Sequence, residues 1–125
     1  MRDYTKIEAW KPADDLTVAV YELTRRFPRQ ETYGLTSQLR RAAYSVPSNI
    51  AEGSSRGTKR DYLHFLYMAR ASLSETQCFL HLARRLGYVS NEAADAIQGR
   101  VKQTFACLHG LTRAVERESG NAAGS

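Results

Sequence analysis

The amino-acid sequence predicts an all-α protein, an antiparallel up-down-up-down four-helix bundle. Four segments place apolar residues at alternating steps of three and four, which puts them on one face of a helix. No segment alternates apolar and polar residues for long, as a half-buried β-strand would. The connections between the four segments are short, and short connections favour antiparallel neighbours.

The first two predicted helices end at residues that interrupt helical backbone. Pro28 closes the first segment, and the stretch Gly53–Gly57 closes the second. The apolar positions of the first segment are Ala9, Ala13, Leu16, Val20, Leu23 and Phe27. Those of the second segment are Leu35, Leu39, Ala42, Val46 and Ile50, with the amide of Asn49 also on this face.

The third segment begins at Thr58, a predicted N-cap, and closes at Gly87, a predicted left-handed residue. Its main apolar face consists of Tyr62, Leu66, Ala69, Leu73, Thr76, Leu80 and Ala83. A second apolar stripe consists of Phe65, Met68, Ser72, Phe79, Leu82 and Leu86. We therefore expect this helix to be covered on two sides, and its extra apolar surface favours self-association.

The fourth segment begins at Ser90, another predicted N-cap. Its apolar face consists of Ala94, Ile97, Val101, Thr104, Leu108, Leu111 and Val115. The predicted domain is thus a single bundle over residues 1–118, followed by a flexible C-terminal tail over residues 119–125.

Pro47 lies inside the second helical pattern and predicts a kink there. Because proline has no N–H, the carbonyl of Ala43 must find another partner. Three polar residues follow, Ser48, Asn49 and Glu52. They form either a polar functional site or a structural cluster that fixes the bend. We favour the structural cluster, since buried polar groups are usually paired.

Composition indicates a folded, cytoplasmic protein. The chain has 125 residues, of which 42% are hydrophobic, and this is too apolar for a wholly disordered chain. Cys78 and Cys107 are too few for a disulfide framework, so we expect both to be reduced and buried. The N-terminus lacks the apolar stretch of a signal peptide, and no apolar stretch approaches the ~20 residues of a membrane-spanning helix.

The net charge of +5 is unevenly distributed along the chain. Eight basic and two acidic residues lie between Arg25 and Arg60, a net +6, while the remainder sums to −1. Arginine binds phosphate in a forked geometry, and clustered arginine favours nucleic acid. The predicted nucleic-acid-binding residues are Arg40, Arg41, Arg56, Lys59 and Arg60.

The same cations also have a structural interpretation. Arg40 or Arg41 could pair with Glu52 or with acidic residues of a neighbouring subunit, and cations in the last turns of helices suit the helix dipole. Two hypotheses therefore stand: a protein that binds RNA or DNA, and a structural homo-oligomer that binds a protein partner.

No pattern predicts catalysis, a metal or another cofactor. No glutamate has a histidine three residues later, as di-iron bundles require. Cys78 and His81 could share a helix face, but a zinc site needs four converging ligands. Arg60 and His64 are too close in sequence for the Arg–His spacing of HEPN-type ribonucleases. We therefore predict a protein that is not an enzyme.

Several motifs carry a resemblance to a known family. These are YGLTSQLRRAA at 33–43, SVPSNIAEG at 45–53, FLYMA at 65–69 and LGY at 86–88, together with Trp10. They resemble the four helix bundle family, also called 23S rRNA intervening-sequence proteins, over about residues 7–117. The resemblance implies a helical bundle that assembles into a ring-like homopentamer, and the family has no established catalytic residues.

A similar group of proteins implies possible partners. The accessory proteins of diversity-generating retroelements form basic pentamers that bind nucleic acid and a reverse transcriptase. The resemblance therefore implies a homo-oligomer, RNA or DNA as a partner, and a reverse transcriptase if this chain is of the retroelement type.

Overall fold

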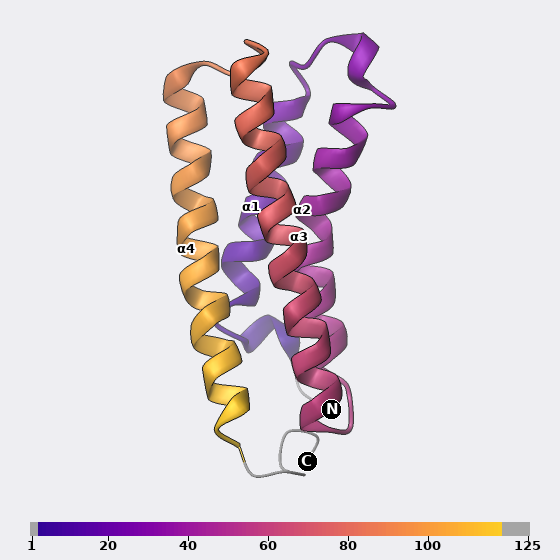
Figure 1. Ribbon diagram of the computed structural model, residues 1–125, viewed down its shortest axis with the longest axis vertical. Helices are drawn as coiled ribbons and strands as arrows, with labels where there is room; N and C mark the ends of the chain where they lie inside the picture. Colours follow the sequence, from indigo (N-terminus) through magenta and orange to yellow (C-terminus); the bar gives the residue numbers. More distant parts are fainter. Residues whose placement is uncertain (1–2, 119–125) are drawn as a thin grey trace.

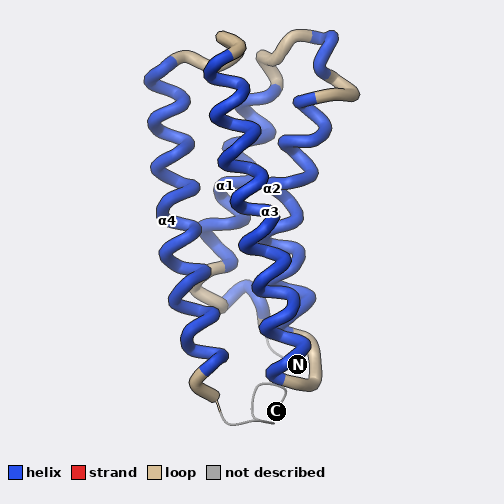
Figure 2. The backbone as a smooth tube through the Cα atoms, viewed as in Figure 1, coloured by secondary structure: helices blue, strands red, loops and turns tan. Residues whose placement is uncertain are grey.

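The computed structural model describes residues 3–118, which form a bundle of four long helices (Figure 1). The helices are α1 (Trp10–Thr24), α2 (Leu35–Ser54), α3 (Lys59–Arg85) and α4 (Asn91–Glu116). Two short 3₁₀ helices precede α1 and α2, η1 (Tyr4–Lys6) and η2 (Arg29–Glu31). Within residues 3–118 there is no β-strand (Figure 2), which confirms the all-α prediction. The predicted tail lies outside the described residues.

The connections lie at both ends of the bundle. In Figure 1 the segment with η2 and the α3–α4 connection lie at one end, and the α2–α3 connection lies at the other. Each helix packs against the next one along the chain, and α1 also packs against α4. The core therefore lies between all four helices.

The predicted apolar faces form this core. Their residues are buried, apart from Leu23, Asn49 and Leu111, which are half-buried. The second stripe of α3 is covered only in part, because Phe65, Ser72 and Phe79 are half-buried but Met68, Leu82 and Leu86 are exposed. The expectation that α3 is covered on two sides is thus met along only part of its length.

The predicted helix ends at Thr58, Gly87 and Ser90 are also observed, whereas α1 ends at Thr24, earlier than the end predicted at Pro28. The Thr58 hydroxyl accepts the N–H of Asp61, and the Ser90 hydroxyl accepts the N–H of Ala93, each at 3.1 Å. Gly87 has φ +78°, and the following N–H of Tyr88 donates to the carbonyl of Ala83 at 3.0 Å. These bonds satisfy backbone groups that the ends of a helix leave unpaired.

The carbonyl freed by Pro47 receives a hydrogen bond from another helix. The Thr17 hydroxyl of α1 lies 3.1 Å from the carbonyl oxygen of Ala43 and 2.9 Å from that of Ala13. Because a hydroxyl has one proton, the two carbonyls share it. α2 continues through Pro47 as one helix, and the bend of its axis stays a prediction.

A carboxylate joins the two connections at one end of the bundle. Gly34 precedes α2 and offers no side chain as a cap, so the Glu31 carboxylate accepts the N–H of Leu35 at 3.1 Å. The other oxygen of Glu31 accepts the hydroxyl of Tyr88 at 2.8 Å. The bond from Tyr88 and then that from Leu35 lower the pKa of Glu31, and the same carboxylate raises the pKa of Tyr88.

The cysteine prediction was wrong in part. Cys78 is exposed and Cys107 is half-buried. Cys78 lies two positions after the buried Thr76, and two helical positions turn a side chain to the opposite side. No helix within residues 3–118 is long and apolar enough to cross a membrane.

Candidate nucleic-acid interface

The five cations predicted to bind nucleic acid lie in two separate places. Arg40 and Arg41 lie in the first half of α2, whereas Arg56, Lys59 and Arg60 lie at the α2–α3 connection. About fourteen helical residues separate the two groups, a distance of about 20 Å along the axis. The five residues therefore do not form one continuous patch.

Arg40 contacts the last turn of α1. Its Nε donates to the Thr24 hydroxyl at 2.7 Å, and its Nη2 donates to the Tyr21 carbonyl at 3.4 Å. The guanidinium also lies over the Tyr21 ring, 4.6 Å from its centroid. A cation here satisfies the end of a helix, so Arg40 joins α1 to α2.

Arg56 and Lys59 also have partners within the chain. Arg56 pairs with Glu52 at 2.6 Å and lies 4.7 Å from the Phe65 ring centroid. The Lys59 ammonium donates to the carbonyl of Glu116 at 2.6 Å and to that of Glu118 at 2.9 Å, at the C-terminus of α4. Glu52 thus pairs with Arg56 rather than with Arg40 or Arg41.

Arg41 and Arg60 remain available to a ligand. Both side chains are exposed, and within residues 3–118 neither forms an ion pair. They lie on different helices, so each would contact a separate part of a large ligand.

The polar residues after Pro47 are not joined to one another by hydrogen bonds in the described part of the chain. The Asn49 amide donates to the Ser45 carbonyl at 2.7 Å, and the Ser45 hydroxyl donates to the Arg41 carbonyl at 2.7 Å. Ser48 is exposed, and Glu52 pairs with Arg56 one turn further on. These bonds satisfy the backbone of α2 locally.

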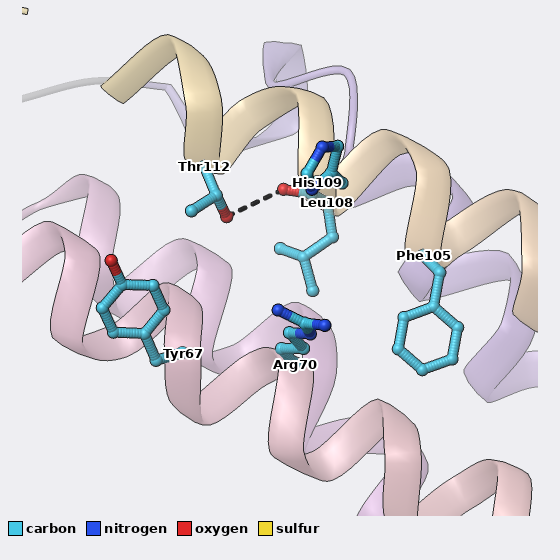
Figure 3. A pocket seen from close by; sticks show the side chains of 6 residues that line it. All are labelled: Tyr67, Arg70, Phe105, Leu108, His109 and Thr112. Atoms are coloured by element: carbon cyan, nitrogen blue, oxygen red, sulfur yellow. Dashed lines mark hydrogen bonds between the residues drawn. The ribbon is translucent and has the colours of Figure 1, made fainter. Parts of the chain in front are cut away.

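A pocket opens between α3 and α4 on the outer side of the bundle (Figure 3). It has a volume of about 170 Å³ and is lined by Tyr67, Arg70, Phe105, Leu108, His109 and Thr112. Figure 3 shows the Arg70 guanidinium reaching from α3 toward α4, between the rings of Tyr67 and Phe105. The floor is the buried Leu108 side chain, and the Thr112 hydroxyl donates to the Leu108 carbonyl at 2.9 Å.

Two further hollows continue this pocket along the same helices. Tyr67 also borders a hollow of about 480 Å³ that is lined by Lys59, Arg60, Leu63 and His64. Phe105 also borders one of about 570 Å³ that is lined by Ser74, Gln77, Cys78, His81, Gln98 and Lys102. The three hollows therefore form a row, which we call the α3–α4 groove, with one aromatic side chain at each junction.

The lining of the α3–α4 groove is cationic. None of the described residues that line it is an aspartate or a glutamate, whereas Arg60, Arg70 and Lys102 are exposed there. All three histidines of the chain line it as well.

Two carboxylates of α4 near the groove, Asp95 and Glu116, have partners within residues 3–118. Asp95 pairs with Arg84 at 3.1 Å. Glu116 accepts the Tyr67 hydroxyl at 3.3 Å and lies 3.9 Å from Arg113. Burial and this carboxylate raise the pKa of Tyr67. Both carboxylates are thus already engaged by side chains of the same chain.

Sequence reasoning missed Tyr67, Arg70, Phe105, His109 and Lys102. A signal was present, because α4 has no acidic residue from Ala96 to Val115. The acidic residues at both ends of α4 hide that signal, because they cancel the basic residues in the net charge of the whole helix.

Spacing predicts that Cys78 and His81 share a helix face, and both line the same hollow. Nowhere between residues 3 and 118 do three or more metal-ligating side chains gather.

Comparisons with known proteins agree with this fold. The family described as 23S rRNA-intervening sequence protein matches residues 5–110. A crystal structure of a protein with unknown function, from the S23 ribosomal protein family of Bacteroides thetaiotaomicron VPI-5482, has the same fold with a TM-score of 0.74. It is 20% identical, and the match covers 83% of this chain and 97% of that chain. No relative among curated proteins matches the chain.

Proposed function

This chain belongs to the 23S rRNA-intervening sequence protein family, and we propose that it is a non-enzymatic, cytoplasmic protein that binds RNA or DNA through phosphate contacts. The observation that carries the proposal is the lining of the α3–α4 groove, where Arg60, Arg70 and Lys102 are exposed and no carboxylate lies among the described lining residues. Cations without carboxylate partners attract the phosphate backbone of nucleic acids.

The five cations predicted from the sequence differ in whether they contact other groups of the same chain. Arg41 and Arg60 are exposed and would contact phosphate. Arg40, Arg56 and Lys59 already bind groups of the same chain, so they serve the fold first. Nucleic acid would have to displace those partners before it could use them.

A salt titration tests the proposed function. Fluorescence anisotropy of a short labelled RNA of mixed sequence would measure affinity between about 50 and 200 mM salt. We expect binding that weakens steeply with salt and depends little on sequence, because phosphate contacts carry no base information. An RNA or DNA that stays unbound at the lowest salt would reject the proposal.

We further propose that the protein is a homo-oligomer, with five subunits as the resemblance implies. Met68, Leu82 and Leu86 support this, because they leave apolar surface exposed along α3. Light scattering should then give a mass well above the 14.1 kDa of one chain at micromolar concentration. A monomeric mass would reject self-association.

The exposed apolar residues also favour the second candidate function, a structural oligomer that binds a protein partner. A reverse transcriptase is such a partner if the chain is of the retroelement type. Under this alternative, Arg41→Ala should dissociate the oligomer. Under nucleic-acid binding, the same variant should keep its mass and bind RNA more weakly, so light scattering and anisotropy on one variant separate the two.

A further inference from the structure

We infer that the α3–α4 groove binds a single-stranded nucleic acid, with unpaired bases against Tyr67 and Phe105 and phosphates at Arg60, Arg70 and Lys102. This inference rests on the proposed function and specifies its site and its ligand. It depends on the order in which aromatic and cationic side chains line the groove.

The two aromatic residues lie where neighbouring hollows meet. Tyr67 borders both the hollow of Arg60 and that of Arg70, and Phe105 borders both the hollow of Arg70 and that of Lys102. The Tyr67 side chain is exposed and Phe105 is half-buried, so each presents ring surface to the groove. The row therefore alternates between a cation and an aromatic ring.

This alternation fits a single strand better than a duplex. A single strand exposes the faces of its bases, and these faces stack on aromatic side chains while the phosphates meet cations. In a duplex the bases stack on each other, and their faces are unavailable to protein side chains. A duplex would therefore use the cations of the groove and leave its two rings without a role.

The hollows also supply apolar surface and hydrogen-bonding groups for bases. Leu63 and Leu108 provide apolar walls beside Tyr67. His109 and Thr112 line the central hollow, and Gln98 lines the hollow beside Phe105. The Nε2 of Gln98 donates to the Gln77 carbonyl at 3.3 Å, while its Oε1 is buried without a hydrogen-bond partner among residues 3–118. Such groups tolerate different bases, so we expect weak sequence preference.

Anisotropy with three labelled probes tests the inference on the full chain: oligouridylate, oligothymidylate and a duplex of the same length. We expect both single strands to bind more tightly than the duplex, and the first two probes tell RNA from DNA. Tyr67→Leu should weaken single-strand binding about 5-fold or more, because stacking of one base contributes about 1–3 kcal/mol. Tyr67→Phe keeps the ring and should bind as the wild type does.

The cations have their own test with a charge-matched control. Arg70→Ala with Lys102→Ala should lower the slope of log affinity against log salt by about 1.4, since each phosphate contact with a single strand contributes about 0.7. Arg26→Ala with Arg29→Ala removes the same charge from exposed positions on the first helix connection and should leave the slope nearly unchanged. Tyr33→Leu is the aromatic control, because Tyr33 is 95% exposed beside η2.

The outcomes separate this inference from the proposed function. Equal weakening by both double variants, or unchanged binding by Tyr67→Leu, would overturn the groove as the site while nucleic-acid binding stands. No binding of any probe at low salt would overturn the proposed function itself. Thermal unfolding of each variant identifies a loss of binding that comes from misfolding. If Tyr67→Leu misfolds, Phe105→Leu removes the other ring of the groove, and unchanged binding by that variant would overturn the role of the rings.

Discussion

Arg40 and Arg56, which lie on α2 and just after it, differ in their partners from Arg70 and Lys102 in the α3–α4 groove. Arg40 and Arg56 contact hydroxyl, carbonyl, carboxylate or aromatic groups of their own chain. Arg70 and Lys102 line an exposed groove and form no ion pair within residues 3–118. Arg40 and Arg56 come from the segment with the larger net charge, yet both are engaged within the chain, whereas Arg70 and Lys102 come from the nearly neutral remainder. Availability to a ligand depends on contacts in space, which a count of charges along the sequence does not record.

Arg40→Ala should have the largest effect on stability. It removes a bond from a charged donor to Thr24 and leaves the end of α1 without its cation, which should cost about 1.5–3 kcal/mol of unfolding free energy. Urea denaturation would measure the loss, and RNA affinity should barely change in the folded protein. The adjacent Arg41→Ala is the matched control and should stay within about 0.5 kcal/mol. If both variants unfold alike, the assignment of Arg40 to the fold is wrong.

Lys59→Met tests a cation that borders the α3–α4 groove but is engaged by α4. Methionine keeps the apolar stem and removes the hydrogen bonds to the carbonyls of Glu116 and Glu118. We expect a loss of about 1 kcal/mol, because a cation at a helix C-terminus stabilises unpaired carbonyls. Arg60→Met, one residue later, should keep its thermal midpoint and bind RNA more weakly. If Arg60→Met is destabilised and Lys59→Met instead binds RNA more weakly, Arg60 serves the fold and Lys59 contacts the RNA.

Arg70→Ala should affect RNA binding and leave stability nearly unchanged, the reverse of what we expect for Arg40→Ala. Because Arg70 is exposed and has no described ion pair, Arg70→Ala should change the unfolding free energy by less than about 0.5 kcal/mol. The same change should lower the salt slope of RNA binding by about 0.7. Urea denaturation and anisotropy on one preparation measure both quantities. If Arg70→Ala is destabilised and binds RNA normally, then Arg70 serves the fold as Arg40 does, and the contrast between Arg40 and the cations of the α3–α4 groove is wrong.

Features set by local spacing could be predicted from the sequence. The apolar faces, the caps at Thr58 and Ser90 and the left-handed Gly87 depend on residues within one or two turns. The need of the Ala43 carbonyl for a partner also followed from Pro47 alone. Its donor, Thr17, did not, because it comes from another helix twenty-six residues away in sequence.

The α3–α4 groove could not be predicted for the same physical reason. Its central pocket forms only where Tyr67 and Arg70 on one helix meet Phe105 and His109 on another. Likewise, Arg40 looked free in sequence because Thr24 lies sixteen residues away. Contacts between helices depend on how far each is rotated and shifted along the bundle, and spacing within one helix does not give that register.

The smallest expected effect concerns Glu31, an anion that, like Arg40, has hydrogen-bond partners within its own chain. Its pKa is lowered from 4.5 by Tyr88 and Leu35, so the folded state binds a proton less readily than the unfolded state. The stability from this carboxylate is therefore fully present above pH 4.5 and is lost as pH falls through the lower, folded-state pKa. Glu31→Gln keeps an acceptor but does not titrate. It should be less stable than the wild type at neutral pH, and the difference should shrink below pH 4.5.

Urea denaturation across the acid range measures that difference, and Glu75→Gln is the control because Glu75 is exposed on α3 and has no ion pair among the described residues. A difference between wild type and Glu31→Gln that stays constant with pH would mean that the charge of Glu31 does not stabilise the fold. Tyr88→Phe should remove most of the pH dependence, since the Tyr88 hydroxyl is the largest cause of the lowered pKa. Glu31 would then resemble Arg40, because each stabilises the fold through hydrogen bonds to groups of the same chain and neither is required for ligand binding.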